Sequence, residues 1–352
     1  MSSNFSEVSY LSSPEFYSLS LYILGFIALP IHIFGANTIL RHTPDTMKRV
    51  KWVMFNFHFW GCSLDVILGI LGQPFIVPPV FGGAPMGLLH LLGVGPGIQV
   101  YIMVTLMLMT AISSGAIFEN RFYLLFAERT WWRYARYPYY VTNVALAFLY
   151  YVPTMMDIPE QTAAREWIFK MHPQVRRFDS PDHPIYVVAY NVPDPDWIRV
   201  RMIISVSIVL TENLGFFFLL RWQMKRAAKL MAMSEKTLAA QKAFLKAINM
   251  QIAIPACIIA TPQILMIVIG YFGWNTSELN SAAYVVMSIH GASGTLVMLY
   301  CHHAYREYCK SKLRGKLSGL NRWKPFVSVT TSERRDEVQI QVPVPNVAVQ
   351  VQ

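Results

Sequence analysis

The sequence predicts an all-α membrane protein: a seven-transmembrane helix bundle with its N-terminus outside and its C-terminus in the cytoplasm. Three observations predict this fold. Of the 352 residues, 54% are hydrophobic and only 14% are charged, whereas soluble domains carry about 25% charged residues. Seven apolar stretches are at or near the length of about 20 residues that crosses a bilayer. Lysine and arginine also gather in the segments on one side of these stretches.

The seven stretches have the length of helices and lack the alternating pattern of membrane β-strands. The first is too long for the core of a signal peptide and has no basic residue before it, so we expect an uncleaved anchor after an extracellular tail at residues 1–15. The transmembrane domain covers 16–304, with predicted spans at 16–40, 52–76, 87–118, 139–157, 198–220, 247–272 and 281–304.

The orientation follows from the distribution of basic residues. The segments assigned to the cytoplasm carry 24 lysines and arginines, and the opposite side carries six. Positive charge stays on the cytoplasmic side during insertion, and it attracts anionic lipid of the inner leaflet. The net charge of +10 therefore needs no nucleic-acid partner. Asn4 and Asn275 begin Asn-x-Ser/Thr sequons on the extracellular side, where we expect glycosylation.

Two loops contain predicted secondary structure. The cytoplasmic loop 221–246 is rich in helix-forming residues and should extend helices five and six, with a new helix starting at Ser234. In the largest extracellular loop, Asp157 and Glu160 have the spacing of a capping box, with Pro159 in the first helical turn. Further on, 185–190 is apolar and β-branched and should form a short strand or a lid.

The C-terminal part is predicted to lie on the inner leaflet and then lose order. Segment 305–324 places apolar side chains among basic ones, as amphipathic surface helices do; the apolar positions are Tyr308, Leu313, Leu317 and Leu320. Cys309 is either a palmitoylation site or a free thiol. Residues 325–352 are predicted to be a disordered cytoplasmic tail.

Prolines interrupt several predicted helices. Pro255 and Pro262 lie in helix six, where each removes a backbone hydrogen bond and favours a kink that lets the inner half swing. Pro30 and Pro74 should act in the same way near the ends of helices one and two. Such kinks serve motion in a receptor and only shape the packing of a passive bundle.

An acid, an amide and a base stand together where the charge-free run from Val66 to Phe118 stops: Glu119, Asn120 and Arg121. One interpretation is a solvated helix end whose arginine reaches lipid phosphates. The other is an ionic latch, in which a carboxylate holds the arginine at rest and releases it to a cytoplasmic partner. Such a switch needs two states that a ligand shifts by a few kcal/mol.

Three polar residues are predicted to be buried in the bundle. Asp65 and Glu212 lie in the middle of helices two and five, and a lone carboxylate there costs about 2.5–3.5 kcal/mol, so both should face the interior. Asp65 could be a cation site and Glu212 a ligand or proton contact, or both could be neutral, hydrogen-bonded carboxyl groups. His290 with Gly291 could form a polar hinge in helix seven, or the histidine could simply be a packing residue.

Three motifs in the right order resemble one family. They are "FENRF", the outer "PEQ" (Pro159, Glu160, Gln161) and "HGASGTLVMLYCHHAYR" (290–306). Together they resemble nematode serpentine receptors of class H over roughly 15–310, although helix capping alone could explain the outer motif. The resemblance implies a seven-helix chemosensory G-protein-coupled receptor in the plasma membrane, in a sensory-neuron cilium. The expected partners are a small chemical ligand and a heterotrimeric G protein.

By the same resemblance, Glu119 and Arg121 would take the place of the acid-Arg-Tyr motif of the wider receptor superfamily. The chain departs from that superfamily in two respects. Helix seven has no Asn-Pro-x-x-Tyr, and the four cysteines offer no extracellular pair for a disulfide. The acid nearest to the inner end of helix six is Glu235, about three turns before the apolar part. The partner of Arg121 is therefore left open.

The sequence carries no enzyme signature: there is no phosphate-binding glycine loop, no metal-spaced Cys/His set and no nucleophile elbow. We therefore expect no enzymatic activity and no cofactor. A transporter or ligand-gated channel is the main alternative to a receptor, although the internal repeats typical of transporters are missing. A membrane scaffold that binds no ligand is a third possibility.

Overall fold

The computed structural model describes residues 13–190, 194–230, 234–271 and 277–320. Within these ranges six helical spans are long and apolar enough to cross a membrane. They are α1 (Pro14–His42), α2 with π-helical η3 (Lys48–Val66, Ile67–Leu71), α4 with π-helical η4 (Pro96–Phe122, Tyr123–Ala127), α8 (Asp194–Lys229), α9 (Glu235–Tyr271), and α10 with α11 (Ser277–Met287, His290–Cys301).

A seventh crossing is present if α5 (Trp132–Leu149) and α6 (Val152–Met156) form one span together with the bent helix that follows. That helix, α7 (Gln161–Met171), is bent away from α5 and α6 by 80°. The predicted all-α bundle is therefore confirmed, with up to seven crossings. The sequons at Asn4 and Asn275 and the tail 325–352 lie outside the described residues.

The predicted boundaries of the second, third and fourth spans are wrong. The second span ends at Leu71, and Pro74–Ile76 forms a strand, so Pro74 does not kink this helix. The third span begins at Pro96, because the chain turns at Gly93, whose φ of 76° ends a helix. The fourth begins at Trp132 rather than at 139. Its first turns contain arginines, which lower the hydropathy of the segment but can still lie in a helix at the membrane surface.

A three-stranded antiparallel sheet covers one end of the bundle. Its strands are β1 (Pro74–Ile76), β2 (Phe81–Pro85) and β3 (Tyr186–Ala189), in this order. The strand expected within 185–190 is confirmed, but the hairpin was not predicted. The central residues of β2 are glycines. A Cβ on Gly82 would lie 2.4 Å from the Tyr186 oxygen of β3, and one on Gly83 would lie 2.2 Å from the Phe75 oxygen of β1.

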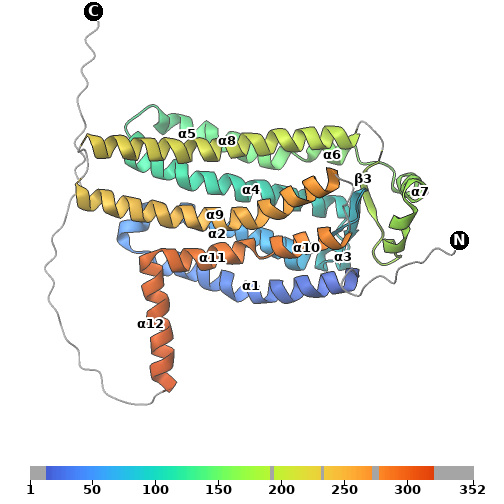
Figure 1. Ribbon diagram of the computed structural model, residues 1–352, viewed down its shortest axis with the longest axis horizontal. Coiled ribbons are helices and arrows are strands. Elements are labelled where there is room, and N and C mark those ends of the chain that lie inside the picture. The colour runs from blue at the N-terminus through green and yellow to red at the C-terminus, as the bar shows by residue number, and fades with distance from the viewer. Residues whose placement is uncertain (1–12, 191–193, 231–233, 272–276, 321–352) are drawn as a thin grey trace, which may run out of the picture.

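Figure 1 shows the bundle lengthwise. The sheet and α7 lie at one end, which we call the sheet end. α12 (His303–Leu320) lies at the other, the α12 end, and runs across the long axis of the bundle. The 3₁₀-helices η2 (Asp45–Met47) and η5 (Pro173–Phe178) and the short α3 (Leu88–Leu91) lie in the connections. As predicted, α8 and α9 extend into the segment 221–246, and α9 begins directly after Ser234.

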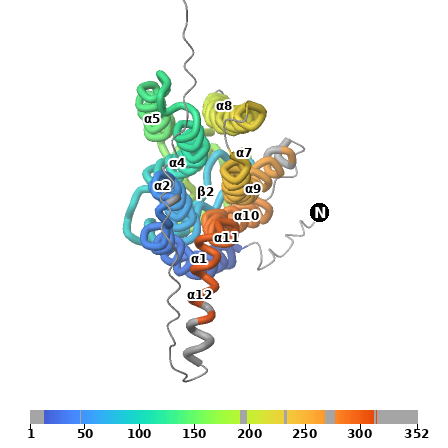
Figure 2. The backbone as a smooth tube through the Cα atoms, turned by 90° about the vertical axis from the view of Figure 1, so that its left-hand side faces the viewer, coloured from blue at the N-terminus to red at the C-terminus, as the bar shows by residue number. Residues whose placement is uncertain are grey.

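Viewed from the end, α4, α5 and α8 lie toward one side of the bundle, and α1, α11 and α12 toward the other (Figure 2). α4 packs against α2, α5 and α8, whereas α9 packs mainly against α11 and α10. An apolar cluster joins α4, α8 and α9; it consists of Ile117, Phe118, Leu220, Met224 and Ile248 together with Phe57. Elsewhere the outer faces are apolar: Ile33, Phe218 and Ile264 are 69%, 61% and 60% exposed, which suits a lipid environment.

Candidate functional site

Glu119 joins α4 to α5. Its carboxylate is fully buried and accepts hydrogen bonds from Trp132 Nε1 at 2.7 Å, Tyr140 Oη at 2.5 Å and Arg136 Nη2 at 2.9 Å. Arg136 also donates to Asn120 Oδ1 at 3.3 Å. Three donors, one of them cationic, offset the cost of burying the carboxylate. All three come from α5, so Glu119 and Asn120 hold this helix against α4.

Arg121 contacts a different helix. Its Nη2 donates a hydrogen bond to Gln241 Oε1 of α9, and its guanidinium carbon lies 4.3 Å from the centre of the Phe244 ring. A guanidinium at this distance is attracted to the face of the ring. Within the described residues no ion pair joins Arg121 to Glu119. The acid and the base of the motif therefore bind two different helices.

These contacts bear on the two interpretations of the motif, a solvated helix end and an ionic latch. Glu119 is not at a solvated helix end, because its side chain is fully buried. Arg121 is half-buried and contacts the side-chain amide of Gln241 and the ring of Phe244. The latch hypothesis expected a carboxylate in this position. The role of Arg121 as a switch stays a prediction.

Further contacts at the α12 end connect α9 to the last helices. Buried His302, between α11 and α12, has its Nε2 3.0 Å from Gln251 Oε1 of α9, and its ring lies 5.4 Å from that of Phe244. Fully buried Tyr305 has its hydroxyl 2.9 Å from Thr43 Oγ1, at the end of α1. Phe244, which stacks on Arg121, therefore also contacts His302 between α11 and α12.

Asp65 is the centre of a second buried cluster, which joins α1, α2 and α11. Its Oδ1 accepts from His290 Nδ1 at 2.6 Å and from the Gly291 amide at 3.0 Å. Its Oδ2 accepts from His32 Nε2 at 3.1 Å and from the Ala292 amide at 2.7 Å. Four N–H donors surround the carboxylate. No group of three His, Cys, Asp or Glu side chains in the described residues could hold a metal ion.

The cluster lies at a break in the last transmembrane span. α10 ends at Met287 and α11 begins at His290, so the amides at the start of α11 have no partner within a preceding helical turn. Asp65 supplies that partner from α2, and its negative charge suits the positive end of α11. A Cβ on Gly291 would lie 2.6 Å from the Gly61 oxygen. Only glycine at 291 allows the two helices to approach so closely.

Glu212 lies on α8 and faces α5, where Tyr139 and Asn143 interact with its carboxyl group. It therefore lies between two neighbouring helices rather than in the middle of the bundle. The next residue, Asn213, carries the polar contact to α4: its Oδ1 accepts from Ser114 Oγ at 2.8 Å. The proposed ligand or proton contact of Glu212 stays a prediction.

The outer motif fixes α7 against the sheet. The predicted capping box is wrong, since Glu160 rather than Asp157 is the N-cap and α7 begins at Gln161. The amides of Ala163 and Thr162 donate to the Glu160 carboxylate at 2.7 and 2.9 Å and lower the pKa of Glu160.

Gln161 connects the motif to β3. Its Oε1 accepts from the Val187 amide at 2.9 Å, and its Nε2 donates to the Val187 oxygen at 3.0 Å. The side-chain amide therefore pairs with both backbone groups of one strand residue. Pro159 lies just before the N-cap, and its oxygen accepts from Gln161 Nε2 at 2.9 Å. The motif thus joins the start of α7 to β3 at the sheet end.

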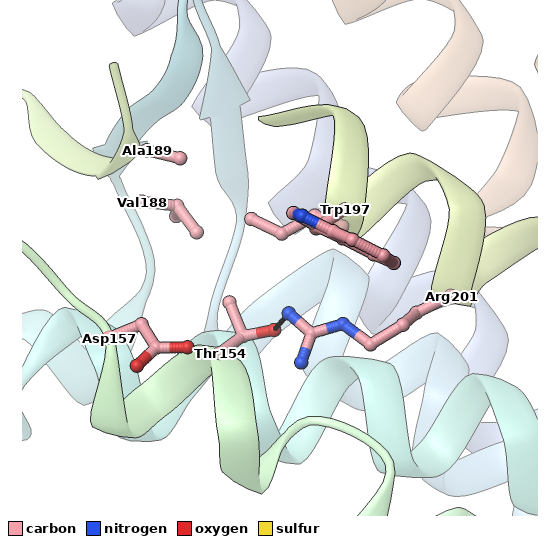
Figure 3. Close-up of a pocket in the computed structure, with 7 residues that line it drawn as sticks. Thr154, Asp157, Val188, Ala189, Trp197 and Arg201 are labelled. Atoms are coloured by element: carbon pink, nitrogen blue, oxygen red, sulfur yellow. Dashed lines mark hydrogen bonds between the residues drawn. The ribbon is translucent and has the colours of Figure 1, made fainter. Parts of the chain in front are cut away.

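A pocket of about 170 Å³ opens at the sheet end between α6, β3 and the start of α8 (Figure 3). Arg201 Nη2 donates to Thr154 Oγ1 at 2.9 Å. The lining residues are Thr154, Asp157, Val188, Ala189, Trp197, Ile198 and Arg201. The pocket therefore lies beside the fourth and fifth transmembrane helices.

Sequence reasoning missed most partners of the predicted site residues. Arg136 stands 17 residues after Glu119 in the same aromatic stretch, so the basic and aromatic residues of that stretch were a usable signal. His32 is an ionisable residue within an otherwise apolar span, which also marks a functional or buried polar site. Gln241 and Arg201 carried no such signal, because their roles depend on which helices are neighbours.

Comparisons with known proteins agree with this architecture. A family described as "Serpentine type 7TM GPCR chemoreceptor Srh" matches residues 12–315. Serpentine receptor class H-72 of Caenorhabditis elegans is 24% identical over 318 residues, covering 86% of this chain and 87% of the relative. The crystal structure of squid rhodopsin superimposes with a TM-score of 0.54 and covers 86% of both chains. At 10% sequence identity this match shows a shared fold alone.

Proposed function

Because this chain belongs to the Srh family of serpentine chemoreceptors, we propose that it binds a small chemical cue outside the cell and activates a heterotrimeric G protein inside. As a member of this family it is a multi-pass membrane receptor rather than an enzyme. Family membership also favours this function over a transporter or channel. The plasma membrane of a sensory cilium is the location that we infer from the family.

The observation that supports G-protein activation is the contact of Arg121 with α9. A hydrogen bond from a charged group contributes about 1.5–3 kcal/mol, and a cation–π contact adds about 0.5–2 kcal/mol. Together these contacts favour a resting state by a few kcal/mol, which a ligand with differential affinity can overcome. When α9 moves away, the guanidinium becomes available to a partner at the α12 end.

α9 suits such a movement. It carries Pro255 and Pro262 in its interior, and each proline removes a backbone hydrogen bond. A Cβ on Gly294 of α11 would lie 2.9 Å from Pro255 Cγ, so the first proline packs directly against the neighbouring helix. We propose that α9 pivots at these prolines and that the Arg121 contact opens.

The function can be tested in cells that express a promiscuous Gα subunit. A panel of small chemical cues is expected to contain at least one that raises the signal only in cells with the receptor. The same cue should give no response in cells without G proteins. An ionic current that persists in the G-protein-free cells would instead favour a channel or a transporter.

The orientation can be tested separately with glycosylation acceptors in a chain that carries Asn4→Gln and Asn275→Gln. An acceptor inserted within 179–184, at the sheet end, is expected to receive a glycan. One inserted within 230–234, between α8 and α9, should stay unmodified, because the basic residues keep this loop in the cytoplasm. The opposite pattern would reverse the orientation, and the proposed coupling at the α12 end would fail with it.

A further inference from the structure

The pocket at the sheet end carries an acid and a base that do not bind each other. In the part of the chain that the structure describes, the Asp157 carboxylate has no hydrogen-bond or ion-pair partner. Arg201 donates one hydrogen bond, to Thr154, and leaves most of its five N–H groups free. Figure 3 shows the two charged side chains on either side of Thr154. The pocket therefore offers opposite charges to one ligand.

The remaining walls are apolar and aromatic. Trp197 and Arg201 are four residues apart on α8 and hence on the same face of that helix. Trp197 is 61% exposed and available for contact. An ammonium group binds well to the face of a tryptophan ring. Val188 of β3 and Ile198 of α8 add an apolar surface.

Resting on the proposed function, we propose that this pocket recognises a small zwitterion of amino-acid type. Its carboxylate would lie against Arg201 and Thr154, and its ammonium group against Asp157 and Trp197. Arginine binds carboxylates with two parallel hydrogen bonds. The volume of about 170 Å³ is below the 300–1,000 Å³ of sites for drug-sized ligands, so the ligand should have a short apolar body.

The experiment measures thermal stabilisation of the purified receptor in lipid nanodiscs, without a G protein. The probes are three amino acids, each with the amine that lacks its carboxylate and the acid that lacks its ammonium group. The sets are alanine with ethylamine and propanoate, valine with isobutylamine and 3-methylbutanoate, and leucine with 3-methylbutylamine and 4-methylpentanoate. In at least one set the amino acid is expected to bind tenfold or more tightly than either single-charge analogue.

Two variants assign the charges. Arg201→Gln should remove the preference for the amino acid over the amine, because the carboxylate of the amino acid then has no cationic partner. Asp157→Asn should remove the preference over the acid. Arg176→Gln and Asp182→Asn are matched controls, since both residues are exposed at the sheet end and outside the pocket. They should leave binding unchanged.

Two results would overturn the proposal: an amino acid that binds no better than its analogues in all three sets, or equal binding to Arg201→Gln and to the unchanged receptor. Because binding is measured without a G protein, failure here is distinguishable from failure of the proposed function. A receptor that signals but does not discriminate among the three probes has its ligand site elsewhere or takes another class of ligand.

Discussion

Replacing Asp65 with asparagine is expected to destabilise the receptor by ~3–5 kcal/mol, the usual cost of breaking a buried ion pair. The carboxylate accepts from two histidines and from two amides at the start of α11. An asparagine would place its own NH₂ group against some of these donors. The expected result is a fall of about 5 °C or more in the apparent melting temperature of the purified protein, with less receptor at the cell surface.

Asp45→Asn is the control, because Asp45 is an exposed acid whose ion pair among the described residues is with exposed Lys48, at 2.5 Å. Exposed pairs contribute about 0–1 kcal/mol, so this variant should melt like the unchanged chain. Equal stability of both variants would show that the Asp65 cluster does not hold α11. If sodium stabilises the unchanged receptor and Asp65→Asn abolishes this effect, Asp65 is a cation site.

Replacing Arg121 with alanine is expected to abolish ligand-evoked G-protein activation while the amount at the cell surface stays the same. The side chain is half-buried between α4 and α9. The proposed active state needs its guanidinium for the partner. The alanine side chain leaves no cation there. Ligand-evoked activation should therefore be lost even though the receptor stays folded. The measurement compares G-protein activation per receptor at the surface.

Arg129→Ala is the matched control for this variant. Arg129 lies at the same end of the bundle, two residues beyond η4, and is exposed. Removing it changes the net charge by the same amount without touching α9. Normal signalling by Arg121→Ala would remove Arg121 from the mechanism. A similar loss in both variants would indicate that general positive charge matters, rather than this one contact.

The bundle could be predicted from the sequence because its signals are local. Apolar length and the position of basic residues identify a crossing without any knowledge of its neighbours. The hairpin of β1 and β2 could not be predicted in this way. Gly82 and Gly83 give no alternation of apolar and polar side chains, and prolines flank the strands. Only the close approach of backbones explains these glycines.

The candidate site was predictable only in part. Asp65 and Glu119 were identifiable as acids in an apolar context, which marks them as costly unless they are paired. Their partners belong to other helices, and single-sequence spacing says nothing about which helices meet. For this reason His32, Arg136 and Gln241 became known only from the structure. The partner of Arg121 was left open by the sequence for the same reason.

The central claim is that the contact of Arg121 with α9 restrains the receptor at rest. The most direct measurement is ligand-free nucleotide exchange on Gα in cells or nanodiscs, with the double variant Gln241→Leu, Phe244→Leu. This variant removes both the acceptor and the ring but keeps an apolar volume in place. Lys242→Leu is the control, since Lys242 is exposed one residue further along α9. Basal exchange about tenfold above that of the unchanged receptor is the predicted result, with no change for the control. Basal exchange that stays the same or falls in the double variant, at equal surface level, would contradict the claim.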